Sequence, residues 1–461
     1  MNETAAIFAS DYAVLAAVNI GVFVSAILVI MMQPGFMLLE AGSVSRKNAI
    51  NNIFKNMIDF CVGGLVFWAV GFSVFSGEGP VIDLLGSLGL TKDPGPAGPA
   101  TLSPADTLFF LFQLGFASAA VTVSSGAVTA RISPYAYLLF AGMFTGVIYP
   151  VVGFLVWHPA GVLYGEFTDF AGAVVVHSTG AAAGLAGAVL LRPRIGFNGY
   201  DPVGLGQEQL LRIAASHAPH NTPIAALGVF LLWIGWFGFN GGTLLAAGAP
   251  SGVLNEGVDP IGALPGLMDG FGVVLVNTAL APCAAVLTLM AFQTLLGEDL
   301  NFQDLLNSVI AGLVAVTAAA DVLSTPMALV AGAAAALVYR ATRFALAAFS
   351  IDDPVGAMPA HGLTGVLGAA MVASAAPEGW LGVAISQTAY ALAIFVGVFL
   401  ASAIAFVLAA WACRLGYLIS GRIGLRDAFR GEFLRVDFET EIYGLDESLH
   451  GQDAYNFRSL S

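Results

Sequence analysis

The sequence predicts an all-α polytopic membrane protein, and three observations lead to this fold class. First, 58% of the 461 residues are hydrophobic and only 10% are charged, whereas a soluble domain carries about 25% charged residues. Second, apolar stretches of about 20 residues, long enough to span a bilayer as a helix, recur along the whole chain. Third, the 55 glycines are typical of membrane helices, because small residues let neighbouring helices approach closely.

Eleven membrane-spanning helices can be drawn, followed by a polar tail. They cover roughly residues 14–42, 49–76, 105–128, 134–157, 170–191, 222–245, 271–296, 303–320, 325–348, 355–376 and 384–416. The first stretch lacks a preceding basic segment and a cleavage site, so we expect a permanent helix rather than a signal peptide. Residues 77–104 and 246–270 are rich in glycine, proline and acidic residues, which favours loops. We therefore expect a membrane domain over residues 1–416 and a polar cytoplasmic tail over residues 417–461, to which the family resemblance described below gives a regulatory role.

The basic residues predict the orientation of these spans. If the N-terminus lies outside, all of the 16 lysines and arginines except Lys92 fall in inner loops or in the tail. Cytoplasmic loops carry such an excess of positive charge. The sequence therefore predicts an N-out, C-in protein with an odd number of spans.

One motif occurs twice, in spans that run in opposite directions. The fifth span carries Asp169 and His177, and the tenth carries Asp353 and His361, so each aspartate is followed by a histidine eight positions later. Eight helical residues rise about 12 Å, which places each histidine near the middle of the membrane. Recurrence with reversed direction is typical of an inverted repeat with a substrate path between its halves. We expect spans one to five and six to ten to be pseudo-symmetric, with the eleventh span peripheral.

Two neutral histidines in a narrow apolar path can share a hydrogen bond and suit a small polar molecule or a proton. The alternative is that each histidine only joins two helices by hydrogen bonds. Two histidines lack the further ligands of a zinc site, so we expect no metal. Asp169 begins its span and is expected mainly to stabilise that helix end.

Aromatic residues flank the expected outer approach to the histidines. Phe116, Trp157 and Phe239 could form a cation-binding vestibule, although each could also be a packing residue or, for Trp157, part of the interfacial belt. Thr243 could hydrogen-bond a small ligand or its own helix.

Other function classes find no support in the sequence. The three cysteines form no pair at disulfide or metal spacing, and the net charge of −14 argues against nucleic acid. No GxSxG or HExxH motif occurs, so we expect neither an enzyme nor a cofactor.

Several segments together resemble the ammonium transporter (Amt/Mep/Rh) family, in its microbial and plant Amt type. They are GFMLLEAGSVSRKNAINNIFKN (35–56), FQLGFA (112–117), DFAGAVVVHSTGAAAGLAG (169–187), WIGWFGFNGG (233–242), the stretch around His361 and YGLDESLHGQDAY (443–455). The resemblance covers nearly the whole chain.

The resemblance implies a homotrimer in the lipid of the plasma (inner) membrane, with one pore in each subunit and a role in nitrogen uptake. Ammonium, or methylammonium as its analogue, would be recruited at Phe116, Trp157 and Thr243, and the rings of Phe116 and Phe239 would form a gate. His177 and His361 would be the twin histidines that line the pore. Ammonium would lose its proton near the outer site, ammonia would cross, and the proton would follow by way of the histidines. The tail would couple subunits and could meet a PII-type signalling protein.

Three departures from the family pattern concern the two ends of the pore. Thr243 stands where serine is usual, Ala130 replaces a common acid before Arg131, and His158 with Pro159 follows Trp157 where glycines are typical. Two rival functions stay open. One is an electroneutral, Rh-like channel for ammonia and carbon dioxide, and the other is an ammonium sensor that signals through the tail.

Overall fold

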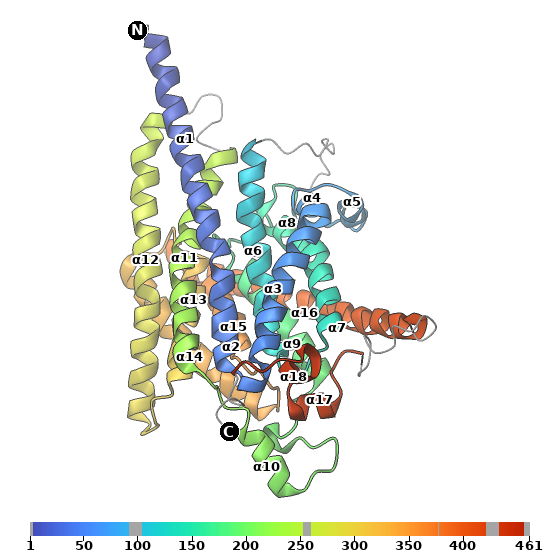
Figure 1. The fold of residues 1–461 in the computed structure, drawn as a ribbon. Coiled ribbons are helices and arrows are strands. Elements are labelled where there is room, and N and C mark those ends of the chain that lie inside the picture. The colour runs from blue at the N-terminus through green and yellow to red at the C-terminus, as the bar shows by residue number, and fades with distance from the viewer. Residues whose placement is uncertain (1–2, 92–103, 252–259, 377, 421–432, 456–461) are drawn as a thin grey trace.

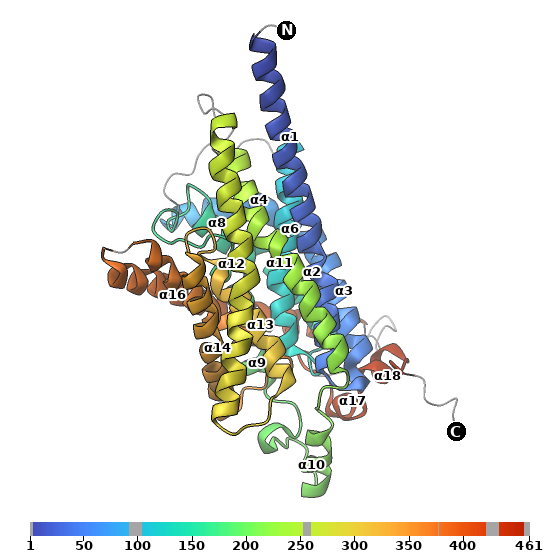
Figure 2. The same cartoon turned by 90° about the vertical axis from the view of Figure 1, so that its left-hand side faces the viewer.

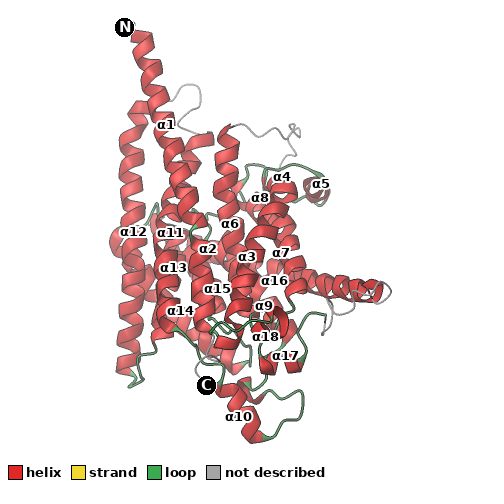
Figure 3. Ribbon diagram, in the orientation of Figure 1, coloured by secondary structure: helices red, strands yellow, loops and turns green. Residues whose placement is uncertain are grey.

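The computed structural model describes residues 3–91, 104–251, 260–376, 378–420 and 433–455, and within these ranges the regular elements are helices packed in one bundle (Figure 3). The two termini lie at opposite ends of the bundle (Figure 1), as an odd number of spans requires. The helices of the first half are α1 (Glu3–Ile30) continued by α2 (Met32–Ser43), α3 (Ala49–Val66), α4 (Phe72–Phe75), α6 (Pro104–Val128), α7 (Pro134–Met143), α8 (Tyr149–Trp157) and α9 (Thr179–Leu191). Those of the second half are α11 (Thr222–Ser251), α12 (Pro260–Leu295), α13 (Phe302–Thr317), α14 (Thr325–Ala348), α15 (Ala357–Met371) and α16 (Trp380–Ser420).

The expected spans are present as helices. Among the described residues, nine helical segments are long and apolar enough to cross a membrane. Two shorter ones, α13 with 16 residues and α15 with 15 residues, complete the expected set. Both short helices pack in the interior of the bundle, and α13 is buried along most of its length. The chain is an all-helical polytopic membrane protein.

Among the described residues, three spans contain a π-helical turn, whose hydrogen bonds join residues five positions apart. Residues Phe67–Gly71 (η2) and Phe144–Ile148 (η3) are π-helical turns that join α3 to α4 and α7 to α8. A third π-helical turn, η4 (Ala173–Ser178), precedes α9 and contains His177. Such turns are rare in proteins and are frequent at functional sites.

The two expected loops were partly wrong. The stretch 77–104 contains the helix α5 (Pro80–Ser87), and the stretch 246–270 is entered by the end of α11 and the start of α12. Proline indicated a loop in both places. Pro80 and Pro260 instead lie in the first turn of a helix, where the missing N–H group has no intrahelical partner to lose.

The surface of the bundle is apolar over most of its length. On α16 the exposed large side chains include tryptophan, leucine, isoleucine and valine: Trp380, Leu381, Ile385, Leu392, Val396, Leu400, Ile404, Val407, Leu408, Trp411 and Leu415. This helix of 41 residues is about 60 Å long, twice the thickness of the hydrocarbon layer, and it crosses the bundle obliquely (Figures 1 and 2). It also continues past residue 416, where the tail was expected to begin.

The inner end of the bundle carries short elements that belong to loops and tail. They are η1 (Arg46–Asn48), η5 (Phe197–Gly199), α10 (Gln207–Ala215), α17 (Phe438–Tyr443) and α18 (Leu445–His450), while η6 (Val372–Ala375) continues α15. The helix α18 packs against α3 and η1. The tail is therefore docked onto the membrane domain of its own chain.

Candidate functional site

The two histidines of the repeated motif meet in the interior of the bundle. The Nδ1 atoms of His177 and His361 are 3.3 Å apart, and both side chains are buried. A hydrogen bond between two Nδ1 atoms requires one ring to donate and the other to accept. The Nε2 atom of His177 has no hydrogen-bond partner among the described residues, so it is open to a molecule in the path.

The same local structure delivers both histidines to this point. Gly172 and Gly356 lie three positions after Asp169 and Asp353, and both adopt the left-handed conformation, with φ of 97° and 83°. Glycine adopts this conformation without the strain of a Cβ atom. Each aspartate then accepts backbone N–H groups from the first turn of its helix. The motif Asp-x-x-Gly-Ala-x-x-x-His therefore starts two inward-pointing helices from opposite ends of the bundle.

The two aspartates accept hydrogen bonds from different numbers of backbone N–H groups. Asp169 accepts N–H groups from Gly172 at 3.2 Å, Val174 at 2.9 Å and Val175 at 2.8 Å. Asp353 accepts two, from Gly356 at 3.0 Å and from Met358 at 2.7 Å. Both carboxylates thus satisfy N–H groups that a helix start leaves without partners.

Two aromatic rings cover the histidine pair on its outer side. The rings of Phe116 and Phe239 are stacked, with centroids 3.9 Å apart and an interplanar angle of 8°. The Phe239 ring lies 5.2 Å from the His177 ring. At a centroid separation of 3.9 Å the Phe116 and Phe239 rings are in van der Waals contact, so no molecule can pass between these two rings in this arrangement.

The remaining residues of the expected vestibule lie around this ring pair. The Trp157 ring is 6.3 Å from the Phe116 ring, and its Nε1 donates to the Asp169 carbonyl at 2.7 Å. The Thr243 hydroxyl donates to the carbonyl of Phe239 in its own helix at 2.9 Å. This bond uses the only hydroxyl proton of Thr243, which leaves its oxygen able to accept a hydrogen bond.

His158, the departure next to Trp157, packs away from this pair of rings. Its ring stacks on Phe154 at 4.9 Å, and its Nδ1 accepts the N–H group of Ala160 at 3.2 Å. Partial burial lowers the pKa of His158. The imidazole is therefore neutral at physiological pH.

A small cavity lies on the inner side of the histidine pair. Its lining includes His361, Phe36, Glu40, Thr122, Asn307 and Val355. The volume open to the centre of a water-sized molecule is about 10 Å³, roughly what one ordered water needs. The stacked rings, the two histidines and the small cavity thus follow one another through the bundle.

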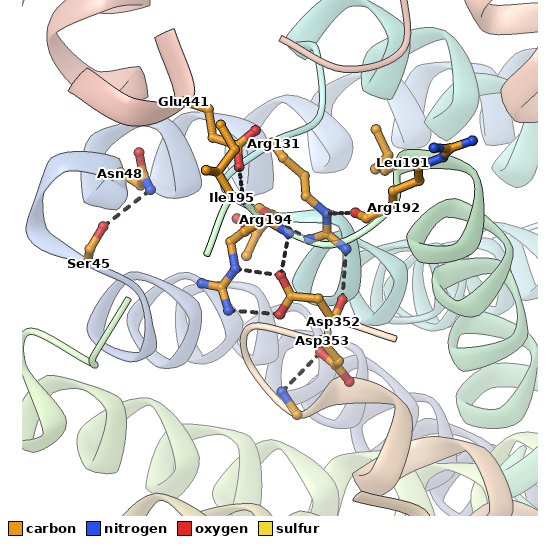
Figure 4. A network of polar contacts seen from close by, with 12 residues as sticks. Ser45, Asn48, Arg131, Leu191, Arg192, Arg194, Ile195, Asp352, Asp353 and Glu441 are labelled. Atoms are coloured by element: carbon orange, nitrogen blue, oxygen red, sulfur yellow. Dashed lines mark hydrogen bonds and ion pairs between the residues drawn. The ribbon is translucent and has the colours of Figure 1, made fainter. Parts of the chain in front are cut away.

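Below the cavity, arginines and acids join the two halves of the bundle (Figure 4). Arg194 forms a two-point ion pair with Asp352, with N–O distances of 2.7 Å and 2.9 Å. Arg131 donates to the backbone carbonyls of Thr129, Arg192 and Asp352. Because residue 130 is alanine, no acidic residue directly precedes Arg131. Its guanidinium N–H groups donate to these three carbonyls instead.

The tail is tied into the same inner layer by buried polar contacts. Arg435 pairs with Glu441 at 2.7 Å, and the other oxygen of Glu441 accepts the N–H group of Ile195 at 2.8 Å. Asp446 accepts the N–H groups of Ile50 and Asn51 at the start of α3. The tail therefore contacts the start of α3 and the loop that follows α9.

Sequence reasoning missed residues that contact the histidines from other helices. Trp236 stacks on His177 at 4.7 Å and donates its Nε1 to Thr317 at 2.9 Å, and Phe36 lies 6.3 Å from His361. Trp236 lies within the quoted stretch WIGWFGFNGG, three residues before Phe239, and one helical turn places both on one face. Phe36 also lies within a quoted stretch, 35–56, but no helical spacing relates it to His361.

The chain is similar to known proteins over most of its length. A profile of the Ammonium Transporter Family matches residues 20–455. A putative ammonium transporter of Synechocystis sp. is 36% identical over 372 residues, which are 79% of this chain and 76% of that protein. Ammonium transporter Amt1 of Haloferax mediterranei is 34% identical over 458 residues, or 94% of this chain and 78% of that protein.

Solved structures agree with these matches. A protein named Sensor Amt Protein has a TM-score of 0.70 and 31% identity, over 94% of this chain and 98% of its own. Mep2 of Candida albicans has a TM-score of 0.65 at 23% identity, over 86% of this chain and 84% of its own, and this likeness concerns the fold.

The sequence, the buried histidine pair and the comparisons now agree. The protein is a multi-pass protein of the cell membrane and has a transport function rather than an enzymatic one. It belongs to the ammonium transporter family.

Proposed function

We propose that the protein takes up ammonium at its outer face, removes one proton, passes ammonia through the bundle and moves the proton by way of the histidine pair. The observation that carries the proposal is the His177–His361 contact at 3.3 Å, buried behind the stacked rings of Phe116 and Phe239. A dry path of this kind penalises a bare cation far more than a neutral molecule.

The outer site would hold ammonium by its charge and its N–H groups. The faces of Phe116 and Trp157 attract a cation, and the Thr243 oxygen accepts a hydrogen bond because its proton is engaged with the Phe239 carbonyl. No acidic side chain is needed for this recruitment. The site would also take methylammonium, which keeps the charge and three N–H groups.

The stacked rings would act as a gate. A centroid separation of 3.9 Å leaves no passage, so at least one ring must rotate for each molecule that enters. Behind the gate the open Nε2 of His177 offers ammonia its first polar partner. The Nδ1–Nδ1 contact would let a proton pass from one ring to the other.

Currents on ammonium jumps test the proposal. Purified protein in liposomes should give saturable currents, and His177→Ala and His361→Ala should each abolish or strongly alter them. His158→Ala is the matched control, because this histidine lies outside the path and should leave the currents unchanged. Rapid ammonia flux without current would instead support the electroneutral channel.

A second function, ammonium sensing, has one specific observation in its favour. The solved structure with 31% identity and a TM-score of 0.70 is named a sensor, and the tail of this chain is docked onto the inner loops. Ammonium binding with neither current nor flux would support sensing. Co-purification of a partner with a transport-dead variant would support sensing together with transport.

We also propose that the chain assembles as a homotrimer and that its tail provides the contact for a PII-type signalling protein. Family membership supports both proposals, and the docked tail offers a structured surface at the inner face. Native mass spectrometry of the purified protein would give the subunit number. Removal of residues 433–461 should abolish binding of the signalling protein.

A further inference from the structure

A cluster of buried charged side chains lies beside the path and has no role in the steps above. The exposed fractions of Glu40, Lys55 and Asp59 are 1%, 3% and 0%. The Lys55 Nζ is 3.3 Å from Glu40 Oε2 and donates to the Ser125 carbonyl at 2.7 Å. The Tyr137 hydroxyl donates to Asp59 at 2.8 Å.

The formal charges of this cluster do not balance. Glu40 and Asp59 carry two negative charges when ionised, whereas Lys55 carries one positive charge. A surplus charge in the interior is costly unless a proton or a second cation compensates it. The cluster would therefore be stabilised by a proton or by a small cation.

One atom of the cluster is available to such a cation. Glu40 Oε2 accepts the Ser125 hydroxyl at 3.0 Å and pairs with Lys55, but Oε1 has no hydrogen-bond partner in the described part of the chain. Glu40 lines the inner cavity together with His361, and Asp59 does not. The free carboxylate oxygen thus belongs to the residue that faces the path.

We propose that Glu40 forms an inner ammonium site, in which Oε1 accepts an N–H hydrogen bond from an ammonium ion in the cavity next to His361. The cavity has room for about one water-sized molecule, and ammonium is of that size. The bound cation balances the surplus negative charge of Glu40, Lys55 and Asp59. This inference rests on the proposed transport function and adds a second site, on the inner side, to the aromatic site outside.

Two variants, Glu40→Gln and Asp59→Asn, each remove one negative charge from the cluster. Comparing them distinguishes ammonium binding by Glu40 from a purely structural role of the cluster. Glu40→Gln and Asp59→Asn each leave one positive and one negative charge, but only Glu40→Gln alters the lining of the cavity. Currents would be recorded in inside-out and right-side-out vesicles, so that ammonium is presented to one face at a time. We expect Glu40→Gln to raise the half-saturating ammonium concentration about tenfold at the inner face and less than twofold at the outer face. Asp59→Asn should leave both within twofold.

Equal shifts at the two faces, or the same behaviour in Glu40→Gln and Asp59→Asn, would overturn the inner site. If Glu40→Gln does not fold, the double variant Glu40→Gln, Lys55→Gln removes the whole ion pair and should show the same one-sided shift. Failure of both Glu40 variants to fold, with Asp59→Asn intact, would mean that Glu40 is structural and would also overturn it. A wild type that moves no ammonium from either face would contradict the proposed function itself.

Discussion

The repeated aspartates allow a quantitative comparison of two matched substitutions, Asp169→Asn and Asp353→Asn. Asparagine keeps the shape of aspartate and one acceptor oxygen, and replaces the other oxygen with an NH₂ donor. In both residues Oδ1 accepts the N–H group of the following glycine. If the asparagine oxygen keeps that bond, the donors that faced Oδ2 lose their acceptor.

The structure predicts that the two substitutions lower the free energy of unfolding by different amounts. Oδ2 of Asp169 accepts two N–H groups, from Val174 and Val175, and Oδ2 of Asp353 accepts one, from Met358. A buried donor without a partner costs about 1–3 kcal/mol. We therefore expect Asp169→Asn to lower the free energy of unfolding by about 2–6 kcal/mol and Asp353→Asn by about 1–3 kcal/mol.

Denaturation of the purified variants in detergent, titrated with SDS, would measure both losses. Equal losses would mean that the asparagine oxygen at position 169 faces Val174 and Val175 instead of Gly172. A larger loss for Asp353→Asn would refute the hydrogen-bond count as their cause. The same variants also test whether Asp169 contributes to ammonium binding in addition to capping its helix. If its charge helps to hold ammonium outside, Asp169→Asn should raise the half-saturating outer concentration, whereas Asp353→Asn should not.

Three further predictions concern the inner layer and the outer rim. Burial alone would raise the pKa of Asp352, but the charges of Arg194 and Arg131 outweigh burial and lower the pKa. The ion pair of Asp352 with Arg194 therefore stabilises the fold above about pH 4, and this stabilisation is lost as the pH falls further. The free energy of unfolding should accordingly depend less on pH below about pH 4 in Asp352→Asn than in the wild type. Asp446→Ala removes the acceptor for two N–H groups of α3 and should speed proteolysis of the tail severalfold, with Glu439→Ala, at an exposed residue of the tail, as control. Because burial lowers the pKa of His158, we expect His158→Gln to leave the ammonium affinity unchanged from pH 6.5 to pH 8.

The sequence was sufficient to predict the spans and the meeting of the histidines for physical reasons. Apolar length determines which segments cross a membrane, and the basic residues determine their direction. Given opposite directions, an equal spacing of eight residues from Asp169 and from Asp353 places both histidines at the same depth. The structure adds that Gly172 and Gly356 share a positive φ, which the sequence analysis did not predict.

Contacts between distant segments could not be predicted in the same way. Glu40 and Lys55 pair across two helices, and Asp446 caps a helix that begins almost 400 residues earlier in the chain. Neither pairing has a fixed spacing, because the separation in sequence depends on loop lengths. The helical prolines at Pro80 and Pro260 were misjudged for another reason: proline favours a loop and the first turn of a helix alike.

The inverted repeat explains the histidine pair but not a difference between the two faces of the membrane. Symmetry supplies each face with an aspartate cap, a left-handed glycine and a histidine in the interior. The neighbours on other helices break that symmetry. On the outer side the His177 ring faces Phe239, which is stacked on Phe116, so a cation would meet aromatic faces. On the inner side His361 shares a cavity with Glu40, so a cation would meet a carboxylate. An aromatic site releases a small cation more readily than a buried carboxylate does, because a formal charge attracts it more strongly than a ring quadrupole. If both proposed sites bind ammonium, the outer site would exchange it rapidly and the inner site would hold it more tightly, which the one-sided effect of Glu40→Gln would reveal.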